Sequence, residues 1–325
     1  MLKFLWIFIP LLILGILLNI VVGEVIVPLG MVFDPAQTYR VIILDIRLPE
    51  VIACIIVGAN LAVSGAVMQS VFRNPLAEPY ITGTASGALL GALIGLFINV
   101  VLRLGSLSSM IILPILSFVG AMFSIAVVVM FGRGGWLSLV LAGIAVSIML
   151  SSAVMILDTY LLTILPTLPA VVYLLFGTVS GVNWSEDLVM LCVSLPVIAY
   201  LLSSSREINL IMMSDEVAQA SGVNPGQTRN VLITLTGLLT AVSVSFTGII
   251  GFVGLVTPHI TRLLISSSDN SKVMPLSIIS GSTIMLYANI ISKVLVPGVV
   301  MPITAITSLF GVPILLILLR GGRNE

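Results

Sequence analysis

The chain has 325 residues, of which 59% are hydrophobic and only 8% are charged. Soluble chains usually carry about a quarter charged residues, so the composition excludes an ordinary soluble protein and indicates a polytopic membrane protein. The net charge of zero argues against nucleic acid as a partner. Cys54 and Cys192 both lie in apolar runs, where a buried thiol is more common than a disulfide or a metal ligand.

Long apolar runs between charges and turns define the expected fold. A helix needs about 20 apolar residues to cross the hydrocarbon core, and the N-terminal run, which lacks an Ala-x-Ala-like cleavage site, is taken as the first span. The sequence therefore predicts an all-α membrane protein of about ten transmembrane helices, with residues 1–325 in a single transmembrane domain. The predicted segments are Phe4–Val27, Val51–Phe72, Ala88–Leu104, Met110–Phe131, Leu137–Leu157, Leu188–Ser204, Val231–Phe252, the shorter Pro258–Ser266, Val273–Ser292 and Ile303–Leu319. The interrupted stretch Pro166–Val182 is expected to form a short interfacial helix.

The distribution of Lys and Arg predicts the orientation of the spans. With a cytoplasmic N-terminus and ten crossings, only Arg40, Arg47, Arg103 and Lys293 of the 13 basic residues lie outside. Both termini are then cytoplasmic. The short segment Pro258–Ser266 is the weakest element, since without it the last two spans would reverse.

The charged residues argue against two other classes of membrane protein. Every Asp and Glu lies in or beside a predicted loop, whereas ion-coupled carriers usually need ionisable groups within the bilayer. The single histidine, His259, follows Pro258 and is expected to be structural, because one histidine without carboxylates makes a poor metal site. The sequence contains no P-loop, so ATP hydrolysis would have to come from a partner. An ion-coupled carrier and a membrane enzyme stay open as alternatives.

The stretch Gly58–Ala88 predicts a transport route. A helix rich in small residues is followed by the polar turn Arg73–Pro75 and by a segment rich in Gly, Thr and Ser. Irregular polar backbone beside a span is tolerated only where protein or a water-filled path covers it. The small side chains that should let this span pack inside the bundle are Gly58, Ala62, Gly65 and Ala66.

Two further stretches suggest close contacts. In the cytoplasmic loop after the sixth span, Asp215 and Glu216 favour the start of a short helix that ends near Gly222. Such a helix fits a groove of another protein and fits an ordinary amphipathic loop equally well. Farther along, glycines at 248, 251 and 254 share one face of a helix and predict tight helix packing.

A series of short motifs runs through the chain from Arg47 onward. They are Arg47–Pro49, Val57–Ala59, Leu61–Gln69, Asn74–Pro79, Leu141–Gly143, Glu216–Gly222, Gly251–Leu255 with Pro258–Ile260, and Gly311–Pro313. In this order they resemble the iron-siderophore and vitamin B12 permease family of ABC importers (the FecCD/BtuC type). Each motif is weak alone, and together they are specific.

The resemblance implies an assembly and an energy source. Such permeases are ten-helix subunits of the cytoplasmic membrane that pair as a homodimer, or as a paralogous heterodimer, around a central path. Two cytoplasmic ABC ATPase subunits power transport and an extracytoplasmic substrate-binding protein delivers the substrate. This chain would then bind no cofactor, because ATP is used by the partner subunits. The implied substrate is an iron(III)-siderophore or a related metal chelate, with cobalamin or haem as the alternative.

The resemblance also assigns roles to particular residues, none of them catalytic or metal-binding. The ATPase coupling loop comprises Asp215, Glu216, Ala218, Gly222 and Asn224. A cytoplasmic gate has one part in a mobile loop at Thr84, Ala85, Ser86 and Gly87, and a second part near Gly134, at Gly135, Trp136 and Ser138. Arg47 and Lys293 are the expected docking residues for the binding protein.

Three departures from the family pattern concern the outer end. Glu50 stands where a second Arg is common, Val300 where a Glu is usual, and Asn289 where an Asp is common. We expect Glu50 to neutralise part of the outer positive patch and to weaken the attraction of an acidic partner.

Overall fold

The computed structural model describes residues 2–23, 27, 37–102, 106–132, 135–164 and 177–321. The long helices are α1 (Leu2–Val21), α4 (Leu48–Val71), α5 (Thr84–Leu102), α6 (Ser106–Phe131), α7 (Trp136–Ile164), α9 (Trp184–Ser203), α12 (Pro225–Thr247), α13 (Val253–Ile265), α14 (Asn270–Val294) and α15 (Ile303–Gly321). The shorter elements are α3 (Gln37–Val41), the π-helix η1 (Ile42–Arg47), the 3₁₀-helix η2 (Pro79–Thr82), α10 (Ser205–Met213) and α11 (Asp215–Ala220).

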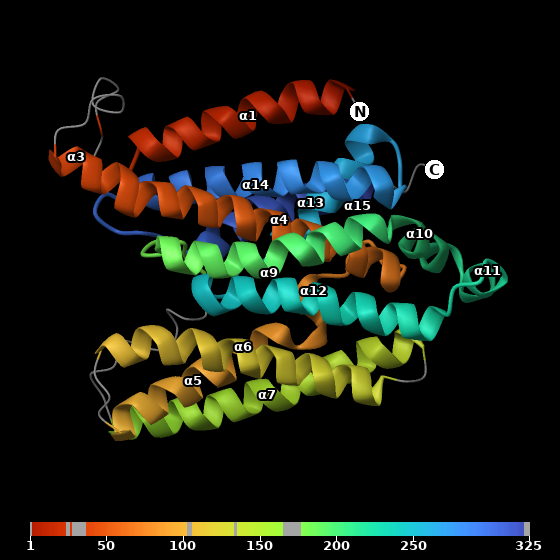
Figure 1. Ribbon diagram of the computed structural model, residues 1–325, viewed down its shortest axis with the longest axis horizontal. Helices are drawn as coiled ribbons and strands as arrows, with labels where there is room; N and C mark the ends of the chain where they lie inside the picture. Colours follow the sequence, from red (N-terminus) through yellow and green to blue (C-terminus); the bar gives the residue numbers. More distant parts are fainter. Residues whose placement is uncertain are drawn as a thin grey trace.

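The helices form one bundle of roughly parallel and antiparallel rods (Figure 1). Eight described helices are long and apolar enough to cross a membrane, and α13 and α15 add two shorter apolar helices within the described residues. All ten predicted segments therefore correspond to helices, which confirms the predicted fold class. Both chain ends lie at the end of the bundle from which α11 projects (Figure 1).

Helix α4 is the centre of the bundle. It contacts α9, α12, α13 and α14, whereas α5, α6 and α7 form a separate layer beside α12. An apolar 18-residue stretch of the continuous helical span Tyr39–Val71, which ends with α4, is 89% buried, against 17% for the span Lys3–Val21 in α1. The small residues of α4 explain this burial. A Cβ at Gly65 would lie 1.7 Å from the carbonyl oxygen of Gly254, and one at Gly58 would lie 2.5 Å from that of Gly281. The predicted packing of this span is confirmed.

The boundary predicted between the seventh and eighth segments was wrong. The span expected at Val231–Phe252 ends at Thr247, and an irregular stretch, Gly248–Phe252, separates α12 from α13. The glycines expected on one helical face do not share a helix, because only Gly254 is helical. His259 consequently lies inside α13 rather than at a helix start. The expected interfacial helix at Pro166–Val182 falls mostly outside the described residues, and its described part, from residue 177, is not helical.

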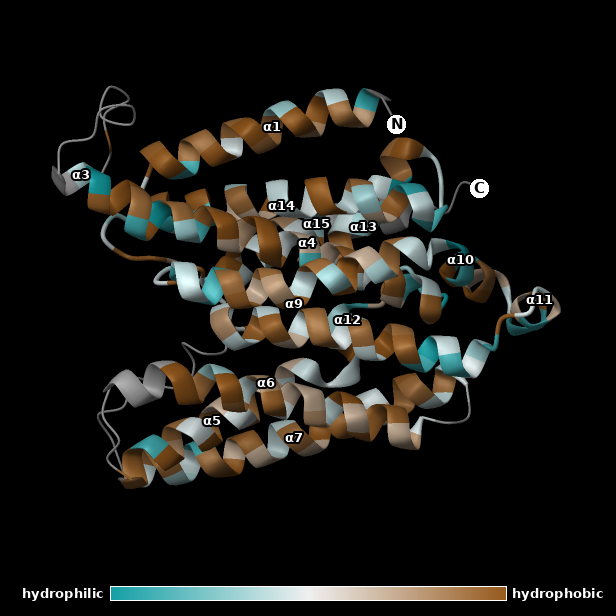
Figure 2. Ribbon diagram, viewed as in Figure 1, coloured by the Kyte–Doolittle hydropathy of each residue, from teal (hydrophilic) through white to brown (hydrophobic). Residues whose placement is uncertain are grey.

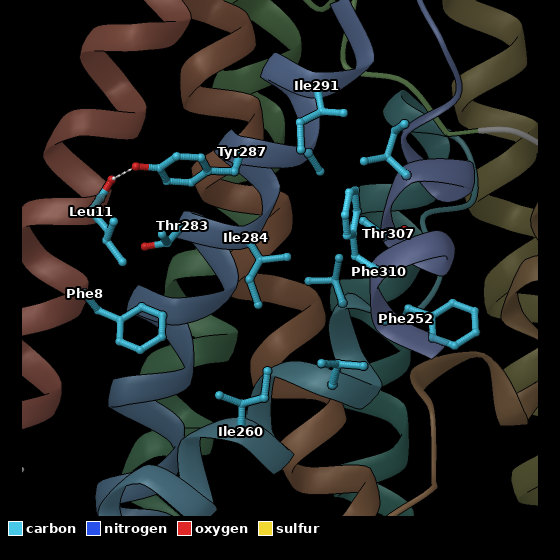
Figure 3. A pocket seen from close by; sticks show the side chains of 15 residues that line it. Phe8, Leu11, Phe252, Ile260, Thr283, Ile284, Tyr287, Ile291, Thr307 and Phe310 are labelled. Atoms are coloured by element: carbon cyan, nitrogen blue, oxygen red, sulfur yellow. Dashed lines mark hydrogen bonds between the residues drawn. The ribbon is translucent and has the colours of Figure 1, made fainter. Parts of the chain in front are cut away.

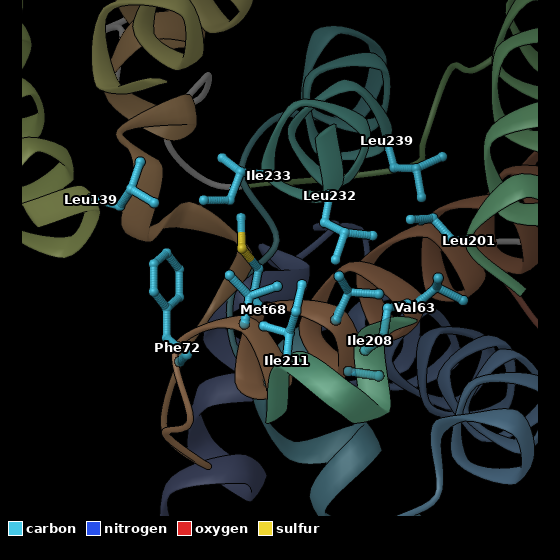
Figure 4. Close-up of a cluster of buried hydrophobic side chains, with 14 of the residues drawn as sticks. Val63, Met68, Phe72, Leu139, Leu201, Ile208, Ile211, Leu232, Ile233 and Leu239 are labelled. Atoms are coloured by element: carbon cyan, nitrogen blue, oxygen red, sulfur yellow. The ribbon is translucent and has the colours of Figure 1, made fainter. Parts of the chain in front are cut away.

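Apolar packing also fixes the end of the bundle near α10. Ile208 and Ile211 of α10 are fully buried in a cluster with side chains of α4, α7, α9 and α12 (Figure 4). Burial of each such side chain contributes about 1.5–3 kcal/mol. Figure 2 shows the contrast between the apolar body of the bundle and the more polar α10–α11 end. That end is thus an ordered part of the fold.

Candidate functional site

The chain between α4 and α5 folds back into the bundle. We call residues Asn74–Gly83 the re-entrant segment. A Cβ at Gly143 of α7 would lie 2.2 Å from the carbonyl oxygen of Ile81, and Gly143 is about two turns, or about 10 Å, from the start of α7. The Thr82 carbonyl accepts a hydrogen bond from the hydroxyl of Ser124 (2.9 Å), which lies about two turns before the end of α6. The segment therefore reaches the interior, and the bundle covers its irregular backbone as a membrane requires.

The re-entrant segment contacts the irregular stretch Gly248–Phe252. The Oε1 of Glu78 accepts a hydrogen bond from the backbone N–H of Phe252 (3.0 Å). The Tyr80 hydroxyl donates to the carbonyl of Ile250 (3.0 Å) and accepts from the N–H of the same residue (3.1 Å). The re-entrant segment and the stretch Gly248–Phe252, which are far apart in the sequence, are therefore joined by hydrogen bonds.

The carbonyl groups of Gly248–Phe252 are occupied within the chain. That of Ile249 accepts from the N–H of Gly177 (2.9 Å) and from the Thr304 hydroxyl. The carbonyl of Gly251 accepts from the Thr307 hydroxyl (2.9 Å). Broken helices of ion-coupled carriers coordinate cations with unwound carbonyls. Here these carbonyls bond to protein groups, which disfavours a cation site at this break.

A cluster of charges lies where α11 meets the bundle. The Oδ1 of Asp215 accepts hydrogen bonds from Arg73, just after α4, and from Arg229 of α12 (2.8 Å). Burial raises the pKa of Asp215, but the two guanidinium groups outweigh it and the pKa lies below its usual value. We call this three-residue cluster the Asp215 clamp. It joins α11 to the ends of two long helices.

The short helix predicted from Asp215 and Glu216 is confirmed as α11. The Ser214 side chain caps it by accepting from the N–H of Val217 (3.1 Å). Ala218 is fully buried, so its small side chain lets α11 sit close to the bundle. Gly222 follows the helix at a φ of +81°, a conformation that favours glycine, and Asn224 caps α12.

The loop expected at Thr84–Gly87, the first part of the gate, is helical instead. Thr84–Gly87 is the first turn of α5 rather than a loop, and Thr84 is buried. A Cβ at Gly87 would lie 2.4 Å from the carbonyl oxygen of Gly120. Glycine serves close helix packing here. A run of small residues occurs both in mobile loops and in tightly packed helices, so the sequence pattern did not distinguish the two.

Among the described residues, the two expected parts of the gate also lie apart. The Ser86 hydroxyl bonds to that of Ser151 in α7 (2.9 Å), about four turns, or about 22 Å, from Trp136. Gly135 has a φ of +107°, and the half-buried Ser138 lies in the first turn of α7. Ala85 is half-buried in α5, and Gly134 lies outside the described residues.

The expected docking cations at the outer end are buried. Lys293 of α14 is 9% exposed and forms an ion pair with Glu50 of α4, itself 4% exposed. Arg47 is 4% exposed and donates to the carbonyl of Ile20. The prediction that Arg47 and Lys293 face a partner from the surface was therefore wrong. Glu50 neutralises Lys293 inside the protein rather than a positive patch on its surface.

An apolar groove of about 410 Å³ lies between α1, α13, α14 and α15 (Figure 3). Its three hydroxyl groups bond within the protein: Tyr287 donates to the carbonyl of Leu11 (3.2 Å), Thr283 to Ile279 (2.8 Å) and Thr307 to Gly251. The groove therefore offers little to a polar ligand. Its lining suits hydrocarbon chains better than a metal chelate.

Comparisons with known proteins agree with this architecture. The sequence pattern of the FecCD transport family matches residues 11–321. The vitamin B12 import system permease protein BtuC of Shigella boydii is 34% identical over 316 residues, 97% of this chain and 94% of the relative. An inferred ABC transporter permease of Methanocaldococcus jannaschii is 32% identical over 291 residues, 86% of this chain and 82% of the relative. A solved inward-facing conformation of an inferred metal-chelate type ABC transporter matches with a TM-score of 0.88 and 29% identity, over 99% of this chain and 100% of that chain.

The bundle and these relatives define a multi-pass membrane permease of the ABC transporter class. The chain belongs to the FecCD transport family.

Proposed function

We propose that this chain is the permease subunit of an ABC importer that carries an iron(III)-siderophore or a related metal chelate across the cytoplasmic membrane. The observation that carries the proposal is the match to a metal-chelate type ABC transporter along the whole chain. The chain breaks no bonds in this scheme. Separate ATPase subunits supply the energy, and the permease supplies a path that opens alternately to each side.

The position of α11 supports an ATPase partner at the end of the bundle that carries both termini (Figure 1). The helix projects beyond the spanning helices, and Glu216 in its first turn is exposed. We place this end in the cytoplasm, as the basic residues predict. Two ATPase subunits would then contact two copies of the permease, either identical or paralogous.

The opposite end is where a substrate-binding protein would deliver its cargo. Since Lys293 and Arg47 are both buried, we propose that docking relies on other surface groups. The turn Val294–Val299 is exposed and almost wholly apolar. The affinity of a partner that docks there would depend little on ionic strength, because salt screens exposed charges and not apolar contacts.

A second candidate substrate is cobalamin, which the similarity to BtuC favours. The test is uptake into proteoliposomes that contain the permease, its ATPase and its binding protein, with ferric siderophore, cobalamin and haem offered in separate assays. We expect ATP-dependent uptake of a ferric siderophore. Uptake of cobalamin alone would show that the substrate is cobalamin and not a ferric siderophore. Uptake of none of the compounds would contradict both proposed substrates.

A further inference from the structure

We propose that the Asp215 clamp and the re-entrant segment form a mechanical link from α11 to the irregular stretch Gly248–Phe252. A displacement of α11 would then move the break between α12 and α13 inside the membrane. This inference rests on the proposed function, since it needs an ATPase that moves α11. It names the residues through which the movement passes.

The cytoplasmic end of the link is held by charge. Asp215 bonds to Arg73 and to Arg229, and the Arg229 side chain is only 2% exposed. The Nε of Arg73 also donates to the carbonyl of Ile211 in α10 (2.9 Å). Arg73 directly precedes the re-entrant segment, so a shift of Asp215 acts on the segment's first residue.

The re-entrant segment is short and internally bonded. The side chain of Asn74 accepts from the N–H of Leu76 (2.9 Å), and its carbonyl accepts from the N–H of Ala77 (3.0 Å). Beyond Ala77, which is fully buried, the N–H of Ile81 donates to the carbonyl of Glu78 (3.1 Å). A segment bonded in this way transmits a displacement instead of absorbing it.

The membrane end of the link is held by Glu78 and Tyr80. As described above, these side chains bond to the backbone of Phe252 and Ile250. Tyr80 contributes two hydrogen bonds, because its hydroxyl bonds to both the N–H and the carbonyl of Ile250. The break in the helices cannot rotate without moving this segment or breaking these bonds.

Unusual backbone angles mark both ends of the link. Arg73 has a φ of +50° and Phe252 a φ of +67°, and both are in the region that favours glycine. Such residues persist only where the surrounding contacts force them, and they concentrate at switch regions. A change in the link would relieve or transfer this strain, which suits an element with two arrangements.

The test compares transport with ATP use in reconstituted complexes of permease, ATPase and binding protein. Asp215→Asn removes the negative charge that forms the two ion pairs of the clamp, and Arg73→Gln removes one of its guanidinium groups. Each should therefore lower the substrate carried per ATP hydrolysed about fivefold or more, the range of coupling between linked sites. The double variant should be no worse than the worse single variant, because both changes break one link. Arg206→Gln on exposed α10 surface is the control for loss of a positive charge at this end.

A second pair of variants tests the membrane end. Glu78→Gln keeps an oxygen that accepts from the N–H of Phe252, so it should preserve the amount of substrate carried per ATP hydrolysed. Glu78→Leu removes that acceptor and should lower this amount as Asp215→Asn does. Copurification of the ATPase shows that each complex is assembled, and if Asp215→Asn fails to assemble, Glu78→Leu decides. Wild-type ratios in assembled Asp215→Asn and Glu78→Leu complexes would overturn the link alone. Absence of ATP-dependent uptake by the wild type would overturn the proposed function as well.

Discussion

Glu50 and Lys293 neutralise each other within the protein at the end of the bundle opposite α11. The two residues come from α4 and α14, which pack closely through Gly58 and Gly281. Removing one partner of such a pair leaves a buried charge without compensation, which costs more than the pair contributes. The departure of Glu50 from the family pattern is therefore compensated inside this chain.

Lys293→Met is expected to destabilise the protein by about 3–5 kcal/mol, because Glu50 would be left as an unpaired buried charge. The double variant Glu50→Gln with Lys293→Met should recover most of that loss. Denaturant unfolding in detergent measures both, with Arg40→Gln at the exposed surface of the same end as the control. Equal stability of Lys293→Met and the wild type would show that the pair is not buried in the native protein.

The charge state of Asp215 sets the pH range of the clamp. Its pKa in the folded protein lies below its usual value, so its stabilising contribution is present above about pH 4 and is lost as the pH falls through the lower, folded value. The difference in stability between the wild type and Asp215→Asn should thus stay constant from about pH 5.5 to about pH 8. Unfolding curves across that range test this, and a difference that shrinks below pH 6 would contradict it.

At the scale of helices, the close contact of α4 with α13 depends on Gly65. A Cβ there would lie 1.7 Å from the backbone of Gly254, which no side-chain movement relieves. Gly65→Ala is expected to cost at least about 1–3 kcal/mol, as overpacking of a filled core does. Gly226→Ala in α12 is the matched control, since its nearest neighbour would be 3.6 Å away. Equal unfolding midpoints for the two variants would contradict the close packing of α4 with α13.

The sequence predicted the helices well and their interruptions poorly. Apolar runs reveal a span because the bilayer demands them, but the run through Gly248–Phe252 stays apolar where the helix breaks. The start of α5 at Thr84 was missed because small polar residues are common both in loops and at close contacts between helices. The pairing of Glu50 with Lys293, and of Arg73 with Asp215, depends on contacts between distant segments that no local pattern records.

In the ten-span topology, α11 and the turn Val294–Val299 lie on opposite sides of the membrane. In a Cys192→Ser background, where the remaining Cys54 is buried, Ser221→Cys and Val299→Cys provide exposed thiols at the two ends. A membrane-impermeant maleimide added outside intact cells should label Val299→Cys and should label Ser221→Cys only after lysis. Labelling of both from outside would contradict the ten-span topology.

The energy source of transport distinguishes an ABC importer permease from an ion-coupled carrier. Proteoliposomes with the permease, its ATPase and its binding protein should accumulate the substrate only when ATP is supplied on the ATPase side. They should lose all uptake when the ATPase carries an inactivating substitution in its own P-loop lysine. Uptake by the permease alone that persists without ATP and collapses when the proton gradient is dissipated would contradict the account and identify an ion-coupled carrier.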